Sequence, residues 1–337
     1  MRLYRLENLG GLDALKLTNA PDPRPGAREV VVRIHACSLN HRDLNIICGG
    51  YTSHAIKPAV IPLSDGAGEV TAIGAGVTRW KVGDRVAPIF VQRWIGGRLR
   101  LEYMSSALGG PSDGVAAESI VLSEEGLVRI PAHLGYEEAA ALPCAAVTAW
   151  NAALVRGALQ PGQTLVTLGT GGVSLFAAQF GLMTGARVIA TTGSQEKVAR
   201  LRALGVTDVI DYRATPDWDR RVRELTDGVG ADLVIEVGGP GSLARSIAAI
   251  RYCGHISAVG NLAGKSRIDP ATLFAKRASM CGIQVGSRDM FEDMNRAIEA
   301  AKLKPVIDRV FDFADAPAAY QYLASAKHFG KVVIRIA

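Results

Sequence analysis

The chain has 337 residues, of which 48% are hydrophobic and 21% charged, so it has ample apolar material for a core and predicts a compact soluble protein of about two domains. The formal net charge is +6, but the 38 Lys and Arg residues are scattered, which favours anionic ligands weakly and argues against nucleic acid. The start "MRLYRLENLG" lacks the apolar stretch of a secretory signal, and the five cysteines contain no CxxC pair. These features exclude a disulfide scaffold, and we expect a cytoplasmic protein.

The first part of the chain, residues 1–145, is typical of strands and turns. In "EVVVRIHA" the apolar residues Val30, Val32 and Ile34 alternate with others, as in a half-buried strand. The stretch "GEVTAIGAGVTRWKVGDRV" carries paired glycines that favour turns. We therefore predict a β-rich domain over residues 1–145.

Residues 157–186 contain no charged side chain and are long enough to span a bilayer. Pro161 and several glycines interrupt them, however, and divide them into a short strand, a glycine turn and a helix. This pattern predicts a nucleotide-binding segment and no membrane helix.

From residue 164 onward, strand and helix patterns alternate, which is typical of a doubly wound parallel sheet. The predicted helix "TPDWDRRVRELT" would begin with Thr215 as N-cap and Pro216 at the first helical position. We assign this second domain to residues 146–286 and expect residues 287–337 to return to the first domain. The six predicted strands are "TLVTL", "RVIAT", "DVIDY", "DLVIEV", "HISAVG" and "GIQVG".

The stretch "LGTGGVSLF" matches a dinucleotide-binding fingerprint, with Ser174 in the third glycine position. Glycine backbone N–H groups at the start of a helix favour a pyrophosphate. The alternative is a plain tight turn between strand and helix. The predicted pyrophosphate contacts are Gly169, Thr170, Gly171, Gly172 and Val173.

The cofactor choice depends on the end of the second strand, where an NAD site usually carries a carboxylate. Here "RVIAT" runs into Thr192, Gly193 and Ser194, and the first carboxylate, Glu196, belongs to the next helix. Hydroxyl groups and Lys197 suit a 2′-phosphate through charge-assisted hydrogen bonds. We predict NADPH, with the alternative that Ser194 only caps its helix and Lys197 is solvated.

Five segments together make the sequence similar to the medium-chain dehydrogenase/reductase superfamily. The resemblance covers nearly the whole chain and implies an α/β protein with a GroES-like catalytic domain and a six-stranded Rossmann domain for NADP(H). Relatives often form homodimers through the Rossmann sheet edge, so we expect a homodimer. The segments are "SLNHRDL", "PLSDGAGEVTAIGAGVTRWKVGDRV", "LPCAAVTAWN", "LGTGGVSLFAAQ" and "FGKVVI".

Zinc-dependent members of this superfamily use a Cys in the first segment, a His in a Gly-His-Glu motif and a Cys before the Rossmann domain. Here Asn40 replaces the first Cys, Ser64 and Asp65 replace the His-Glu pair, and Cys144 alone matches. A catalytic zinc needs three protein ligands. The structural zinc lobe is also missing, because "IFVQRWIGGRLRLEYMSSALGGPSDGVAAE" has no Cys. We therefore expect no catalytic metal.

Without a Lewis acid, hydride transfer suits an acceptor that is already electrophilic, such as a quinone or an α,β-unsaturated carbonyl. The chain looks closest to the zinc-free quinone oxidoreductase and enoyl reductase branches, with Asn40, Asp43 and a Gly-Gly-Tyr51 run. This resemblance implies that Asn40 and Tyr51 are catalytic, with Tyr51 as proton donor. The alternative for Tyr51 is a packed turn residue.

The resemblance and the positions at strand ends imply further cofactor contacts. His41 would contact a phosphate, or is simply a surface histidine. Asn40 would face the nicotinamide ribose, Thr148 the nicotinamide and phosphates, and Tyr212 the adenosine. Backbone groups at the ends of the fifth and sixth strands would meet the carboxamide, and these belong to Gly260, Asn261, Val285 and Gly286.

The leading hypothesis is an NADPH-dependent, zinc-independent reductase of a small apolar or aromatic electrophile, with no nucleic acid or membrane partner. An alcohol dehydrogenase or aldehyde reductase, without metal or with a metal held by other ligands, is the alternative among enzymes. An NADPH-sensing or RNA-binding protein is the alternative from another class, although no RNA-recognition motif supports it.

Overall fold

The computed structural model describes residues 1–51, 54–260 and 269–336. The chain forms two compact units, one of residues 1–147 together with 286–337, and one of residues 148–285. The sequence placed these boundaries after residues 145 and 286. The predicted contact Asn261 lies outside the described residues.

The first unit is built on a mainly antiparallel sheet whose strand order is β14-β15-β3-β4-β5-β7, with β6 also paired to β3. In β3 the side chains of Val30, Val32 and Ile34 are fully buried, as the alternation of apolar residues predicts. Strands β1 and β2 form a separate antiparallel pair. The strand bounds are β1 Arg2–Leu6, β2 Leu15–Asn19, β3 Glu29–Ser38, β4 Asp65–Ile73, β5 Arg85–Pro88, β6 Ser119–Ser123, β7 Leu127–Arg129, β14 Ile307–Asp312 and β15 Lys331–Arg335.

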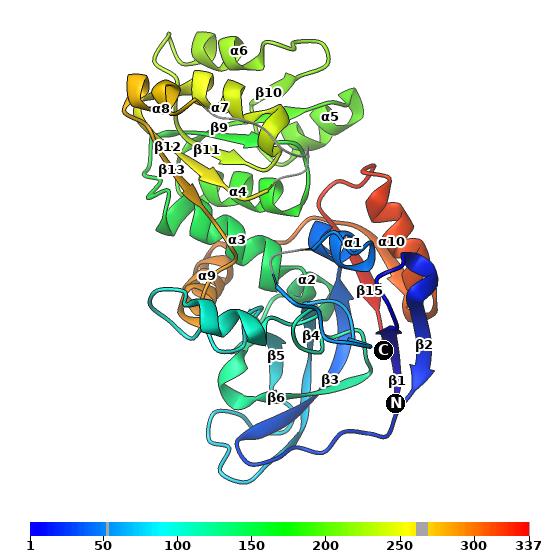
Figure 1. The fold of residues 1–337 in the computed structure, drawn as a ribbon. Helices are drawn as coiled ribbons and strands as arrows, with labels where there is room; N and C mark the ends of the chain where they lie inside the picture. Colours follow the sequence, from blue (N-terminus) through cyan, green and yellow to red (C-terminus); the bar gives the residue numbers. More distant parts are fainter. Residues whose placement is uncertain (52–53, 261–268, 337) are drawn as a thin grey trace. The chain divides into compact units, whose positions relative to one another are not determined.

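Short helices cover this sheet (Figure 1). Helix α2 packs on β3 and β4, and α1 packs against α10. Strand β15 pairs antiparallel with β3, so the last part of the chain completes the first unit. The helix bounds are η1 Leu12–Ala14, α1 His41–Ile47, η2 Leu101–Ser106, η3 Glu124–Gly126, α2 Tyr136–Ala140, η4 Leu142–Ala146, α9 Arg288–Ala301, η7 Phe313–Asp315 and α10 Ala316–Ala324, with α3 Val147–Trp150 continuing from η4 into the second unit.

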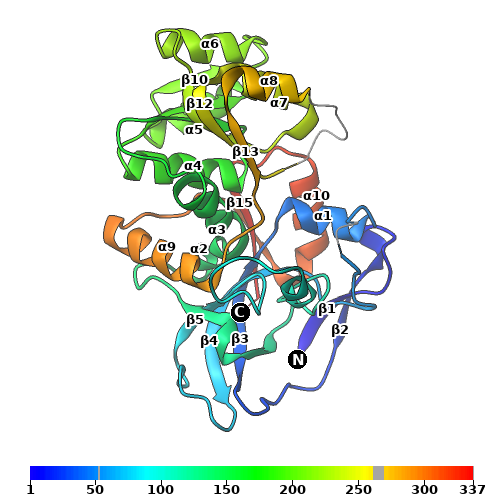
Figure 2. The same cartoon turned by 60° about the vertical axis from the view of Figure 1, so that its left-hand side comes forward.

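The second unit contains a parallel six-stranded sheet in the order β10-β9-β8-β11-β12-β13. This order reverses direction beside β8, which confirms the predicted doubly wound Rossmann topology. Helix α4 lies on one face of the sheet, and α6, α7 and α8 lie on the other (Figures 1 and 2). The bounds are η5 Asn151–Val155, β8 Thr164–Leu168, α4 Gly172–Met183, β9 Arg187–Thr192, α5 Gln195–Ala203, β10 Asp208–Asp211, α6 Trp218–Leu225, β11 Ala231–Glu236, η6 Gly239–Gly241, α7 Leu243–Ala249, β12 Ile250–Ala258, α8 Pro270–Lys276 and β13 Ser279–Gly282.

The sixth strand lies earlier than the sequence predicts. The expected strand was 282–286, but β13 ends at Gly282. Ile283 N still donates a hydrogen bond to Ala258 O, whereas Val285 has a φ of 41° and leaves the extended conformation. The prediction failed because the apolar run continues past the last strand residue.

The start of α6 also differs from the prediction. Thr215 is not the N-cap, because its backbone N–H donates to Asp211 O and closes a turn. Asp217 is the N-cap residue instead, and Pro216 precedes it. A hydrogen-bonded turn after β10 therefore forms at Thr215, and the helix begins after Asp217 and not at Pro216.

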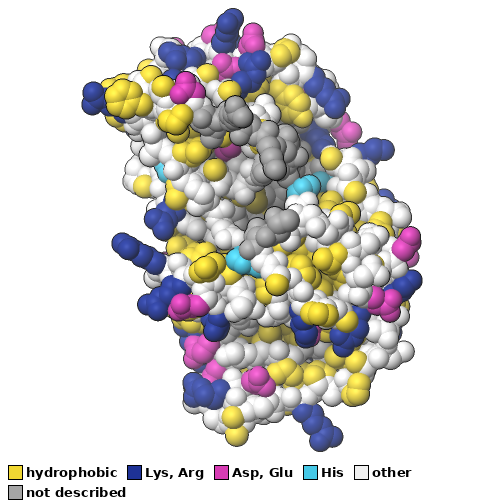
Figure 3. Space-filling model, viewed as in Figure 1, with side chains coloured by type: hydrophobic (Ala, Val, Ile, Leu, Met, Phe, Trp, Pro, Cys, Tyr) yellow, Lys and Arg dark blue, Asp and Glu magenta, His cyan; other side chains and the backbone are white. Residues whose placement is uncertain are grey.

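Within the described residues, no helix is both long and apolar enough to cross a membrane. Figure 3 shows Lys and Arg side chains at scattered points on one face, with Asp and Glu side chains among them. This distribution agrees with the scatter of charge along the sequence.

Candidate functional site

The glycine loop joins β8 to α4. Gly169 has a φ of 71°, a left-handed conformation that favours glycine. A Cβ added at Gly169 or Gly171 would meet no other atom of the described residues within 4 Å. The backbone at Gly169 and Gly171 therefore has open space beside it and fits a ligand phosphate at the start of a twelve-residue helix.

Ser174 explains the departure from the third glycine of the fingerprint. Its side chain is buried, and its Oγ donates a 2.6 Å hydrogen bond to Leu168 O. The hydroxyl thus ties the first turn of α4 to the end of β8. A small side chain fits there because the helix and strand approach closely.

The predicted adenosine contacts gather at the adjacent ends of β9 and β10. Tyr212 N donates to Thr192 O at 2.9 Å, and a Cβ added at Gly193 would lie 2.5 Å from Tyr212 Oη. Ser194 is the N-cap residue of α5, but its side chain makes no capping hydrogen bond in the described structure. Thr192 is only 1% exposed, so Ser194 and Lys197 are better placed than Thr192 to meet a phosphate.

A buried carboxylate that the sequence did not single out fixes the loop after β11. Glu236 is 1% exposed and accepts hydrogen bonds from Gly238 N at 2.8 Å, Gly239 N at 2.9 Å and Ser242 Oγ at 2.6 Å. The feature of the sequence that could have indicated this loop is the Gly-Gly-Pro-Gly-Ser run after β11. Glu236 therefore sets the backbone path at the carboxyl end of the sheet.

Gly260 follows β12 at the same edge of the sheet. Its N–H contacts Glu236 O at 3.2 Å, and an added Cβ would collide with the carbonyl oxygen of Val237. Only glycine allows this close approach of the two backbone segments.

Val285 holds a left-handed conformation that is costly for a β-branched residue. Its carbonyl oxygen accepts a 2.6 Å hydrogen bond from Asn151 Nδ2. Asn151 was not among the predicted residues, although it lies in the segment that carries Thr148. Thr148 lies on α3 and is 4% exposed. A Cβ added at Gly286 would lie 2.5 Å from Val147 Cγ1.

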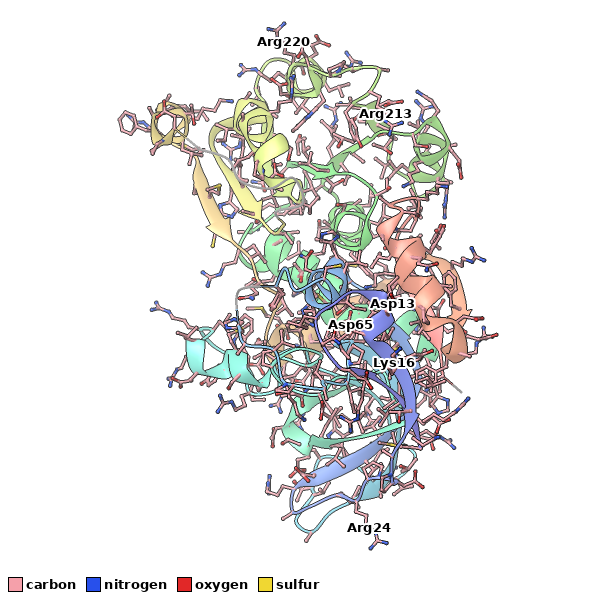
Figure 4. All side chains as sticks on the ribbon, turned by 45° about the vertical axis from the view of Figure 1, so that its right-hand side comes forward. Asp13, Lys16, Arg24, Asp65, Arg213 and Arg220 are labelled. Atoms are coloured by element: carbon pink, nitrogen blue, oxygen red, sulfur yellow. The ribbon has the colours of Figure 1, made fainter. Side chains whose placement is uncertain are left out.

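In the first unit, the positions that would ligate zinc in metal-dependent relatives lie together. Asp65, labelled in Figure 4, accepts hydrogen bonds from Ser64 Oγ at 2.7 Å and from Cys144 N at 3.1 Å. Lys331 Nζ lies 3.8 Å from Asp65 Oδ2 and donates to Asn40 Oδ1 at 2.6 Å. The sequence prediction included Asn40, Asp65 and Cys144 but missed Lys331, which lies in the quoted segment "FGKVVI".

These residues do not fit a zinc ion. A catalytic zinc needs three protein ligands, but Cys144 is the single thiol at these positions, because Asn40 and Ser64 occupy the other two. The buried ammonium of Lys331 adds a positive charge beside Asp65 that would repel a metal cation. Across the described ranges, no group of three or more His, Cys, Asp and Glu residues could hold a metal ion.

Tyr51 lies just after α1 and is half-buried. The guanidinium of Arg42 lies 5.3 Å from the Tyr51 ring centroid and 4.5 Å from that of Phe90. Asn40 is the N-cap residue of α1 and His41 is its exposed first residue. Helix α1 therefore connects Asn40 and His41 with the segment that carries Tyr51.

Asp43 anchors α1 by accepting a 2.7 Å hydrogen bond from Asn40 N. Burial raises the pKa of Asp43 to about 6, and Arg42 and the Asn40 N–H oppose the shift. Because the folded-state pKa exceeds the unfolded value of about 3.9, the unfolding free energy falls as pH rises from about 4 to 6, by on the order of 3 kcal/mol from this group.

Asp43→Asn is expected to remove this pH dependence, because the amide keeps an acceptor for Asn40 N and has no proton to lose. Urea unfolding of both proteins at pH 4, 5, 6 and 7 measures the effect. As pH rises, the unfolding free energy of the variant should increase relative to that of the wild type. Parallel curves would show that Asp43 titrates normally.

A cavity of about 630 Å³ also lies in the first unit, lined in part by His35, Tyr136, Arg309 and Arg335. It contains none of the predicted site residues. The glycine loop and the Asn40–Lys331 region remain the candidate functional positions.

Two family models match the chain. Residues 26–132 match the alcohol dehydrogenase GroES-like domain, and residues 172–302 match the zinc-binding dehydrogenase family. A zinc-type alcohol dehydrogenase-like protein of Schizosaccharomyces pombe is 41% identical over 98% of this chain and 97% of its own length. A quinone oxidoreductase of Pseudomonas aeruginosa is 30% identical over 96% of each chain.

A crystal structure from Sinorhizobium meliloti, assigned to the alcohol dehydrogenases, matches with a TM-score of 0.93 and 38% identity over 99% of this chain and 98% of that one. The fold and these similarities define an oxidoreductase with a GroES-like domain and a Rossmann domain. The chain belongs to the medium-chain dehydrogenase/reductase superfamily, whose members bind a nicotinamide cofactor.

Proposed function

We propose that the protein is an NADPH-dependent, zinc-independent cytoplasmic reductase that transfers hydride to a quinone or an α,β-unsaturated carbonyl. The observation that carries the proposal is the buried Lys331 ammonium beside Asp65 and Asn40, at positions where metal-dependent relatives bind zinc. An alcohol has no Lewis acid there to lower its pKa, so an acceptor that is already electrophilic is favoured.

The cofactor supplies the hydride when it is bound. The backbone of residues 169–173 holds its pyrophosphate at the start of α4, where the N–H groups and the helix dipole favour negative charge. Ser194 and Lys197 hold the 2′-phosphate, and Tyr212 packs at the adenosine end over Gly193. Backbone groups near Gly260 and Val285 bind the carboxamide of the nicotinamide.

After hydride transfer, the reduced acceptor carries negative charge on oxygen and needs a proton at oxygen or carbon. We assign this proton to the Tyr51 phenol and a hydrogen bond to the acceptor oxygen or the ribose to the Asn40 amide. The rings of Phe90 and Tyr51 both lie near the Arg42 guanidinium, and Phe90 supports a substrate with an apolar or aromatic face.

Among the described residues β13 is the last strand of its sheet, and its outer edge supports a homodimer. Met280 on β13 is 39% exposed, Tyr252 on β12 is 55% exposed, and Phe274 on α8 is 82% exposed. Exposed apolar groups at an unpaired strand edge favour association with a second copy of the chain.

Oxidation of NADPH at 340 nm by EDTA-treated protein tests the proposed function. We expect turnover with 9,10-phenanthrenequinone or a short enone to persist within about twofold after chelation, because no step requires a metal. Protein that has not been treated with EDTA is the control, and a panel of aldehydes forms the third arm. Turnover with aldehydes only, or only after zinc is restored, would contradict the proposal and favour an alcohol dehydrogenase.

A further inference from the structure

Lys331 carries a charge inside the first unit that needs an explanation. The residue is only 3% exposed, and removing an ammonium group from water is costly unless partners surround it. Its Nζ donates hydrogen bonds of 2.6 Å to Leu39 O and to Asn40 Oδ1, and it lies 3.8 Å from Asp65 Oδ2. The proposed function takes the lysine as a sign that no zinc is bound, but it gives the lysine no part in ligand binding or hydride transfer.

The lysine determines which end of the Asn40 amide is available. An ammonium group only donates hydrogen bonds, so the amide oxygen must face Lys331 and the amide nitrogen must point elsewhere. Asn40 Nδ2 is buried and has no hydrogen-bond partner among the described residues. A buried donor without a partner is costly, so an acceptor from a bound molecule would relieve this cost.

The surrounding contacts hold this arrangement in place. Asn40 N is tied to Asp43, which fixes the backbone at the start of α1. Lys331 is tied in turn by Asp65, whose two oxygens also bind Ser64 Oγ and Cys144 N. Rotating the Asn40 amide by half a turn would place its NH2 group against the ammonium, where neither side can accept a hydrogen bond.

We infer that Lys331 is a positioning residue that holds the Asn40 amide with its NH2 group presented to an acceptor oxygen. This inference rests on the proposed function, and the acceptor is either a ribose hydroxyl of the cofactor or the carbonyl oxygen of the substrate. Lys331 thus supplies fixed positive charge where metal-dependent relatives bind zinc, and it orients the amide that meets the ligand.

Two variants separate positioning from simple charge balance. Asp65→Asn with Lys331→Met removes both charges together, so no unpaired buried charge remains and the fold should be retained. Asn40→Asp keeps an oxygen for Lys331 and removes the NH2 donor. Lys16→Met, an exposed lysine on β2 labelled in Figure 4, is the control.

We expect the double variant and Asn40→Asp each to lose about 10-fold in binding or turnover, with melting temperatures close to wild type, because each removes one oriented hydrogen bond. The triple variant should lose little more than either, since both changes act through the same amide. A rise in the NADPH dissociation constant identifies the ribose as the acceptor. A fall in kcat/KM for the quinone or enone at unchanged NADPH affinity identifies the substrate oxygen.

A folded double variant with wild-type NADPH affinity and wild-type kcat/KM would overturn the inference and leave Lys331 as charge balance for Asp65. If the wild type reduces none of the acceptors, the proposed function fails separately. In that case the substrate oxygen is no longer a candidate acceptor and the inference rests on the ribose contact, so equal NADPH dissociation constants in all variants would overturn it.

Discussion

Replacing Lys197 with alanine is expected to raise the dissociation constant for NADPH by about 10- to 100-fold and to change that for NADH by less than about twofold. The reason is that a charge-assisted hydrogen bond to a phosphate contributes about 1.5–3 kcal/mol, and only NADPH carries the 2′-phosphate. Lys197 lies in the first turns of α5, after the N-cap residue Ser194, where the helix dipole also favours an anion.

Quenching of protein fluorescence on titration with each cofactor measures this prediction. Lys16→Ala serves as the control, since that lysine is exposed in the other unit. An unchanged NADPH affinity would show that the 2′-phosphate assignment is wrong. Equal losses for both cofactors would show instead that Lys197 supports the local structure of α5.

Tyr51→Phe is expected to lower kcat for an enone by about 100-fold, because general acid catalysis contributes on the order of 10²–10⁴-fold. The enolate formed by hydride transfer is a strong base and gains much from a positioned proton donor. The hydroquinone anion formed from a quinone is a weaker base, so the same variant should lose less activity with 9,10-phenanthrenequinone.

Single-turnover kinetics with bound NADPH, together with thermal unfolding, test the role of Tyr51. The half-buried ring and its contact with the Arg42 guanidinium remain in the phenylalanine variant, so the melting temperature should change little. Tyr103→Phe, in η2, is the matched control for loss of a phenol. An enone rate equal to that of the wild type would leave Tyr51 as a packed turn residue.

Local patterns in the sequence predicted most of the architecture. The alternation in β3 identifies a strand because side chains alternate between the two faces of a sheet. The loop at Gly169 could be recognised because its left-handed conformation favours glycine, and a strand and a helix flank it. The sequence did not predict the ends of β13 or the start of α6. Hydrogen bonds to the neighbouring strand set the ends of β13, and a hydrogen-bonded turn sets the start of α6. Local residue propensities do not include such contacts.

The sequence by itself determined the fold class, the position of the dinucleotide-binding loop and the loss of the residues that usually ligate zinc, because each depends on residue types at nearby positions. Only the tertiary structure decided which groups lie together at those positions. Lys331 meets Asn40 across 291 positions of sequence, and Cys144 N meets Asp65 across 79. Pairing of β15 with β3 brings Lys331 to Asn40, and contact of η4 with β4 brings Cys144 to Asp65. Burial then makes each unpaired polar atom costly, so the arrangement follows from long-range packing.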